Sequence, residues 1–132
     1  MERISVSELK KSFHDVVLLV GNAKQRVVVN DRHGARVGIV PLEDLALLES
    51  LDNGHVPALE RIALPELKRH FTDDLAKVAS GAERIVVQEH DQDMAAVVPE
   101  RDLTLLENLD QRLDIEAAKR LLQEKLENDE DE

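Results

Sequence analysis

The chain contains nearly the same segment twice, and this repeat restricts its fold more than any other feature. Residues 2 to 52 align with residues 60 to 110 at a constant offset of 58 positions without a gap, and 21 of the 51 aligned pairs are identical. Such agreement over an ungapped segment indicates a duplicated unit. The identical pairs include Glu2/Glu60, Arg3/Arg61, Leu9/Leu67, Lys10/Lys68, Phe13/Phe71, Arg26/Arg84, Pro41/Pro99, Asp44/Asp102 and Leu48/Leu106. We call residues 1–52 copy one and residues 59–110 copy two.

Each copy predicts the order strand, helix, two strands, helix, which is an α+β unit. In copy one, apolar residues recur about one helical turn apart from Leu9 to Val20, and Ser7 is the expected N-cap of this helix. RVVVN and ARVGIV then predict two strands of a hairpin with the polar turn DRHG. Pro41 is expected to end the second strand and to open a leucine-rich helix.

The remaining residues predict a connector and a C-terminal helix. Residues 53–58, NGHVPA, can extend about 20 Å, which is enough to place the two copies side by side. A third helical pattern follows residue 110 and runs to about Leu126, and ENDEDE then has the composition of a disordered acidic end. Residues 111–132 are therefore expected to form a C-terminal helix and acidic tail. Because units of about 50 residues are near the lower limit for folding alone, we expect the copies to support each other.

Composition and motifs exclude several classes of function. The chain has no cysteine, so it has neither disulfides nor thiolate metal sites. It has no apolar run of membrane-spanning length and no signal-peptide pattern, so we expect a cytoplasmic protein without membrane contact. Its five histidines lack metal-site spacing, and neither a phosphate-binding loop nor a nucleophile elbow is present. We therefore predict no metal, no cofactor and no enzymatic activity.

The succession SVSELKKSF, a valine-rich strand, DRHG, a strand ending in IVP, and LEDLALLE resembles the Phd/YefM (prevent-host-death) family of bacterial antitoxins. Copy two resembles the same domain in divergent form. The resemblance implies a fold of two tandem β-α-β-β-α units. It also implies a protein that binds operator DNA, represses its own gene, and blocks a toxin with a flexible C-terminal segment.

The resemblance further implies DNA contacts from the first helix and from the hairpin turn. In copy one, Lys10 and Lys11 match the first feature, and Arg32 with Gly34 matches the second. Copy two keeps Lys68 and Arg69 in its first helix. The alternative is that these residues are solvated surface charges.

The hairpin turn of copy two departs from the family pattern. It has His90 in place of Arg32 and Gln92 in place of Gly34, and it carries three acidic residues, Glu89, Asp91 and Asp93. Acidic side chains and the phosphate groups of DNA repel each other, so we expect copy two to bind DNA poorly. The net charge of −11 also argues against strong binding to nucleic acid of any sequence.

Two arrangements of the copies remain open. They can pair within one chain as a pseudo-dimer, at a high effective concentration, or like copies can pair between chains to give a homodimer. The segment VVLLV, residues 16–20, is apolar nearly all round, whereas copy two has DLAKV, with Asp74 and Lys77, and is expected to face water there. We therefore predict that Val16 or Leu19 lies in an interface with the other copy or another chain; the alternative is a core within copy one.

The C-terminal helix needs a surface to cover its broad apolar arc. The residues expected to bind a partner are Leu113, Ile115, Ala118, Leu121, Leu122 and Leu126. One interpretation is a helix that docks in a groove of a toxin, with the acidic end against a basic site. In the other, the helix folds back on its own domain or pairs with a second tail.

Together, these observations predict an antitoxin-like repressor of a type II toxin-antitoxin system. The alternative, from a different class, is a protein-interaction adaptor that kept the fold and lost DNA binding.

Overall fold

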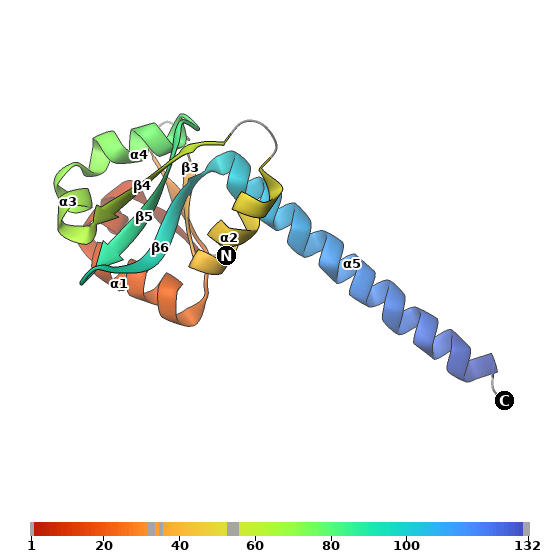
Figure 1. Ribbon diagram of the computed structural model, residues 1–132. Coiled ribbons are helices and arrows are strands. Elements are labelled where there is room, and N and C mark those ends of the chain that lie inside the picture. Colours follow the sequence, from red (N-terminus) through yellow and green to blue (C-terminus); the bar gives the residue numbers. More distant parts are fainter. Residues whose placement is uncertain (1, 32–33, 35, 53–55, 131–132) are drawn as a thin grey trace.

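The computed structural model describes residues 2–31, 34, 36–52 and 56–130, and for residues 126–130 it describes the backbone alone. Within these residues, six strands form one mixed sheet, and five helices flank the sheet or extend from it (Figure 1). The predicted α+β class and C-terminal helix are confirmed. None of the described helices has both the length and the apolar character needed to cross a bilayer.

The two halves of the chain repeat one order of elements. The first half consists of β1 (Glu2–Ser5), α1 (Val6–Ala23), β2 (Val27–Asn30), β3 (Arg36–Val40) and α2 (Leu42–Leu51). The second half consists of β4 (Ala58–Ala63), α3 (Leu64–Arg69), α4 (Phe71–Ala79), β5 (Glu83–Glu89), β6 (Gln92–Pro99) and α5 (Glu100–Glu130). The pair α3 and α4 takes the place of α1.

The sheet joins the halves through its two central strands. Its order is β1-β2-β3-β6-β5-β4, and β3 pairs antiparallel with β6. At the centre Ile39 pairs with Val97, its equivalent 58 positions later. An antiparallel pair that joins equivalent residues has a local two-fold axis between them.

The same symmetry extends outward through the sheet. The parallel pair Glu2↔Val27 corresponds to Glu60↔Ile85, and the antiparallel pair Val27↔Ile39 corresponds to Ile85↔Val97. The two halves therefore have matching registers over most of the sheet.

Both faces of the sheet carry apolar cores that contain residues of both copies. Because successive strand residues point to opposite faces, the valine-rich strands of each copy can supply both cores. Val27, Val29, Ile39 and Val97 face α1, α3 and α4. Val28, Val40, Val86 and Val98 face α2 and the first turns of α5. The central pairing therefore places the two halves around shared cores.

The first helices of the two copies begin and bend at equivalent places. Ser5 is the N-cap of α1, and its hydroxyl accepts a hydrogen bond from the backbone N–H of Glu8 at 3.1 Å. The prediction of Ser7 as N-cap is wrong, because the helix begins at Val6. The backbone leaves helical geometry at Ser12 in α1 and at its equivalent His70, where α3 ends and α4 follows.

The C-terminal helix is not a separate element. α5 continues without a break from Glu100 to Glu130, so the predicted boundary between residues 110 and 111 lies inside one helix. The prediction that ENDEDE is disordered is wrong for residues 127–130, which continue the helix. Beyond the body of the protein, α5 projects as a long free helix that ends far from the sheet (Figure 1).

One glycine sets how closely α5 approaches the sheet. A Cβ atom on Gly38 would lie 2.3 Å from Cδ2 and 2.6 Å from Cγ of Leu103. Such distances are far shorter than van der Waals contact, so Leu103 occupies the space that a side chain at position 38 would need. The equivalent of Gly38 in copy two is Ala96, so the two halves differ in this packing.

We expect Gly38→Ala to lower the free energy of unfolding by about 1–3 kcal/mol, because the added methyl overpacks the core against Leu103. Urea denaturation followed by circular dichroism measures this change. In a Leu103→Ala background the same substitution should cost clearly less. An equal cost in both backgrounds would contradict the contact.

Candidate functional site

The first helices of the two copies meet at the two-fold axis. The rings of Phe13 and Phe71, which are equivalent residues, lie edge to face with their centroids 5.3 Å apart. Both side chains are buried. Edge-to-face contact between aromatic rings is a favoured geometry, so this pair fixes how α1 approaches α3 and α4.

Basic side chains gather on the exposed side of this contact. Lys10, Lys68 and Arg69 line a shallow cleft of about 120 Å³ together with the first turn of α4. All three are exposed. The fold thus brings together residues of the two copies that lie 58 or more positions apart in the chain.

The remaining residues that the family resemblance assigns to DNA contact are Lys11, Arg32 and Gly34. Lys11 is exposed on α1 beside Lys10. Arg32 lies outside the described residues, whereas Gly34 is described and has a positive φ of 81°. Arg69 is 3.3 Å from Glu66, and Asp73 also lines the cleft, so the surface is basic with acidic neighbours.

The acidic hairpin of copy two contacts other parts of the protein. Glu89 lies 2.8 Å from Nε2 of His14 on α1, and this contact joins the two copies. Asp93 accepts a hydrogen bond from Gln88 at 2.8 Å and lies 3.5 Å from Arg61. Two of the three acidic groups are therefore held by neighbouring side chains.

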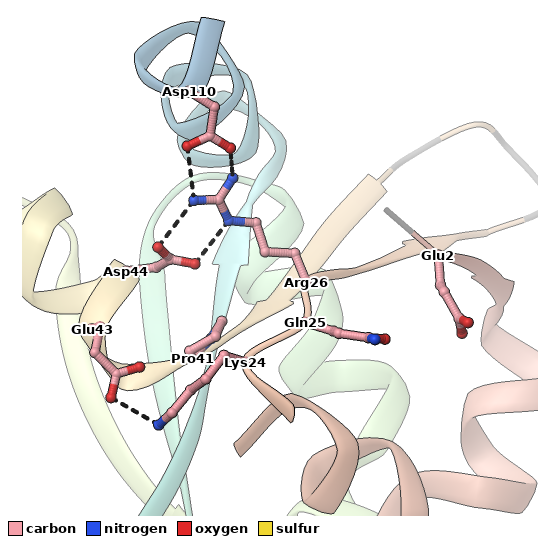
Figure 2. A pocket seen from close by; sticks show the side chains of 8 residues that line it. All are labelled: Glu2, Lys24, Gln25, Arg26, Pro41, Glu43, Asp44 and Asp110. Carbon is pink, nitrogen blue, oxygen red and sulfur yellow. Dashed lines mark hydrogen bonds and ion pairs between the residues drawn. The ribbon is translucent and has the colours of Figure 1, made fainter. Parts of the chain in front are cut away.

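A larger cavity of about 970 Å³ lies at the N-terminal end of α2, which begins just after Pro41. Figure 2 shows the side chains that line it. Arg26 lines this cavity and donates hydrogen bonds to Asp44 at 2.8 and 3.0 Å and to Asp110 on α5. Lys24 donates to Glu43 at 2.9 Å, while Glu2 and Gln25 lie apart from these ion pairs (Figure 2).

The two-fold axis generates a second ion-pair cluster of the same composition. Arg84, the equivalent of Arg26, donates to Asp102 at 2.9 and 3.1 Å and to Asp52 at 2.8 and 2.9 Å. Each arginine thus binds one aspartate of its own copy and one of the other copy. Asp52 and Asp110 are the equivalent pair that crosses between the copies.

The two clusters differ in exposure. The Arg84 side chain is 3% exposed and Asp102 is 5% exposed, whereas Arg26 is 16% and Asp110 is 54% exposed. Val56, Pro57 and Leu59 lie around Arg84 in a cavity of about 410 Å³. The cluster at Arg84 is therefore the more deeply buried of the two.

The ion pairs explain the protonation of these groups. Burial alone would lower the pKa of Arg84, but hydrogen bonds to Asp52 and Asp102 outweigh it and raise that pKa. The hydrogen bond to Asp44 is the main cause of the raised pKa of Arg26. The hydrogen bond from Arg84 lowers the pKa of Asp52 below its usual range. These charges are matched within the protein, which indicates a structural role.

Val16 and Leu19, the residues expected at an interface, are both half-buried on α1. Val16 packs against the core on the α1 face, which contains residues of both copies. The expectation that copy two faces water at this position is wrong for Asp74, which is buried and lies 4.0 Å from Nζ of Lys77. Lys77 itself is exposed.

The residues expected to bind a partner lie on the projecting part of α5. Every residue from Gln111 to Lys125 is exposed, and the apolar ones include Leu113, Ile115, Ala118, Leu121 and Leu122. Leu126 lies in α5, but its side chain is outside the described residues. Within the described part of the chain, this arc does not fold back on the body.

In the described ranges, no group of three or more histidine, aspartate or glutamate side chains is arranged to hold a metal ion. Comparisons with protein-family models, with curated proteins and with solved structures found no match for this chain.

The two ion-pair clusters were not among the features predicted from the sequence. A signal for them was present, because Arg26/Arg84, Asp44/Asp102 and Asp52/Asp110 are identical pairs of the repeat. Charged residues are rarely buried unless they are paired, so identical charges beside buried strands point to an ion pair. The partner across the copies follows only from the three-dimensional pairing.

We expect Arg84→Met to lower the free energy of unfolding by about 3–5 kcal/mol, because it leaves two largely buried carboxylates without their cation. Arg26→Met should cost less, since Asp110 is half exposed and water can solvate it. Urea denaturation at neutral pH measures both changes.

Arg112→Met, at an exposed position on α5, is the control and should have almost no effect. The Asp52 ion pair stabilises the fold above the unfolded-state pKa of about 3.8, and this stability is lost as pH falls through the lower folded-state pKa. The Arg84→Met variant should therefore lose less stability on acidification than the parent protein. Equal costs for both arginine variants would contradict the difference in burial.

Proposed function

We propose that this chain is an antitoxin-like transcriptional repressor related to the Phd/YefM family, with two tandem units that form an intramolecular pseudo-dimer. The observation that carries the proposal is the cleft at the two-fold axis. There, equivalent helices of the two copies place Lys10, Lys68 and Arg69 on one exposed surface. The proposal locates the protein in the cytoplasm, where its operator DNA is found.

In the proposed mechanism, the protein represses transcription by occupying its operator DNA, which it contacts through a small basic surface. Lysine and arginine side chains contact phosphates and fix the position of a protein on the duplex. The whole chain is acidic, with a net charge of −11, so a phosphate backbone is repelled except where the basic side chains face it. The protein should then bind in one orientation, with α1 and α3 toward the duplex.

The second part of the proposal is neutralisation of a toxin by α5. The projecting helix exposes Leu113, Ile115, Leu121 and Leu122, and an exposed apolar arc of this length is typical of a helix that docks in a groove. The sequence ends with acidic residues after Lys125, and these favour a partner with a basic surface. A ribonuclease-like toxin has such a surface.

An adaptor that binds proteins and no DNA is the second candidate. The acidic hairpin of copy two favours it, because Glu89 at the end of β5, Asp91 in the turn and Asp93 in β6 would repel phosphate groups. The free helix α5 serves either function. Binding to DNA separates the two candidates.

We expect Lys10→Ala to weaken binding to duplex DNA from the region upstream of the protein's own reading frame. Loss of one phosphate contact should also reduce the slope of log affinity against log salt concentration by about 1. Fluorescence anisotropy over a range of salt concentrations measures both effects.

Lys119→Ala removes an equally exposed lysine from α5 and serves as the matched control, which should bind like the parent protein. Absence of any binding at low salt would favour the adaptor.

We expect Leu121→Asp to abolish binding to the protein encoded by the neighbouring reading frame without loss of stability, because Leu121 is 67% exposed. Co-purification of the two proteins and thermal denaturation measure the two properties. Gln123→Asp adds the same charge at an exposed position on the opposite, polar side of α5 and should leave co-purification unchanged. Equal recovery with both variants would remove α5 from the proposed function.

A further inference from the structure

The two hairpins are one place where the two-fold symmetry of the molecule fails. In copy one, residues 31–35 separate β2 from β3, and the N–H of Gly34 bonds to the carbonyl of Asp31 at 3.3 Å. In copy two, only His90 and Asp91 separate the strands, both with positive φ, of 51° and 63°. The register also shifts between Val87 and Gln88.

A two-residue loop with positive φ at both positions is a tight turn matched to the twist of its strands. The tip of the copy-two hairpin is therefore a two-residue turn, whereas in copy one β2 ends at Asn30 and β3 begins at Arg36. A surface that reads two symmetric half-sites needs equivalent groups in equivalent places. The different ends of the strands at the two hairpins remove this equivalence.

The charges of the copy-two hairpin also make it inequivalent to the hairpin of copy one. Glu89 and Asp93 are held by His14, Gln88 and Arg61, so they are fixed parts of this surface. Asp91 is exposed at the tip. Because Glu89 contacts His14, one turn of α1 after Lys10, phosphate groups at the basic cleft would be repelled by a nearby carboxylate.

The shared cores, meanwhile, supply within one chain the pairing that a dimer would otherwise provide. The axis passes between Ile39 and Val97 and beside the contact of Phe13 with Phe71. A second chain is therefore not needed to place Lys10 and Lys68 together.

We infer that a single chain binds one duplex on its own and recognises an asymmetric DNA site. Contacts extend from the cleft at the two-fold axis toward copy one, and the copy-two hairpin is held away from the duplex. This inference rests on the proposed function and names the kind of DNA that it requires.

The experiment uses the full chain and tiled duplexes of roughly 30 base pairs, about three helical turns, from upstream of its reading frame. Native mass spectrometry gives the number of chains per duplex, and hydroxyl-radical footprinting gives the protected bases. We expect one chain per duplex and protection on one side of the centre.

Asp91→Asn tests the role of the hairpin, because asparagine tolerates the positive φ and removes the charge. It should tighten binding about two- to fivefold at low salt, as expected for one exposed charge, and extend protection toward the copy-two side. Asp114→Asn on α5 removes an exposed charge far from the cleft in sequence and should change neither property.

The possible failures are distinguishable. Two chains per duplex with a symmetric footprint would overturn the inference and leave the proposed repression intact. Equal effects of the two aspartate variants would overturn the role assigned to the hairpin. If no duplex binds even at low salt, the proposed function fails and the inference fails with it.

Discussion

The antiparallel pairing of β3 with β6 is the interaction on which the rest of the structure depends. It joins Ile39 to its own equivalent Val97 and thereby converts two half-sheets into one sheet of six described strands. A unit of about 50 residues buries too little apolar surface to be stable alone, and both cores here contain residues of both copies. The pairing therefore creates the cores as well as the symmetry.

The two ion-pair clusters, beside β2 and β5, stabilise the same arrangement. Arg26 and Arg84 each bind an aspartate of the other copy. Each cluster therefore adds an ion pair between the copies to the pairing of β3 with β6. Breaking a buried ion pair is costly, since it leaves an isolated charge with little access to water. The more buried cluster, at Arg84, lies beside the segment that joins the copies, whereas the one at Arg26 borders an open cavity. The two clusters therefore have equivalent ion pairs but differ in how far they are exposed to solvent.

The copies are identical at their aromatic contact on the two-fold axis and differ at their hairpins. Phe13 and Phe71 are identical residues in contact at the axis, whereas the two hairpins differ in where their strands end and in charge. Fusion in one chain allows this, because substitutions on the surface of one copy need not appear in the other. The proposed repressor would then keep its DNA-facing surface near copy one. Its outlying helix, α5, is free for a second partner.

The sequence by itself determined the repeat and the order of elements, because an offset of 58 residues and the periodicity of apolar residues are properties of the chain. It left open whether the copies pair within one chain or between chains, which depends on the surfaces that meet in three dimensions. It did not determine where α1 begins, since Ser5 and Ser7 are both good caps and packing decides between them. The burial of Asp74, the unbroken course of α5 and the aspartates that cross to Arg26 and Arg84 were decided by tertiary structure alone. These features depend on which surfaces meet across the two-fold axis, and local sequence patterns carry no information about such long-range contacts.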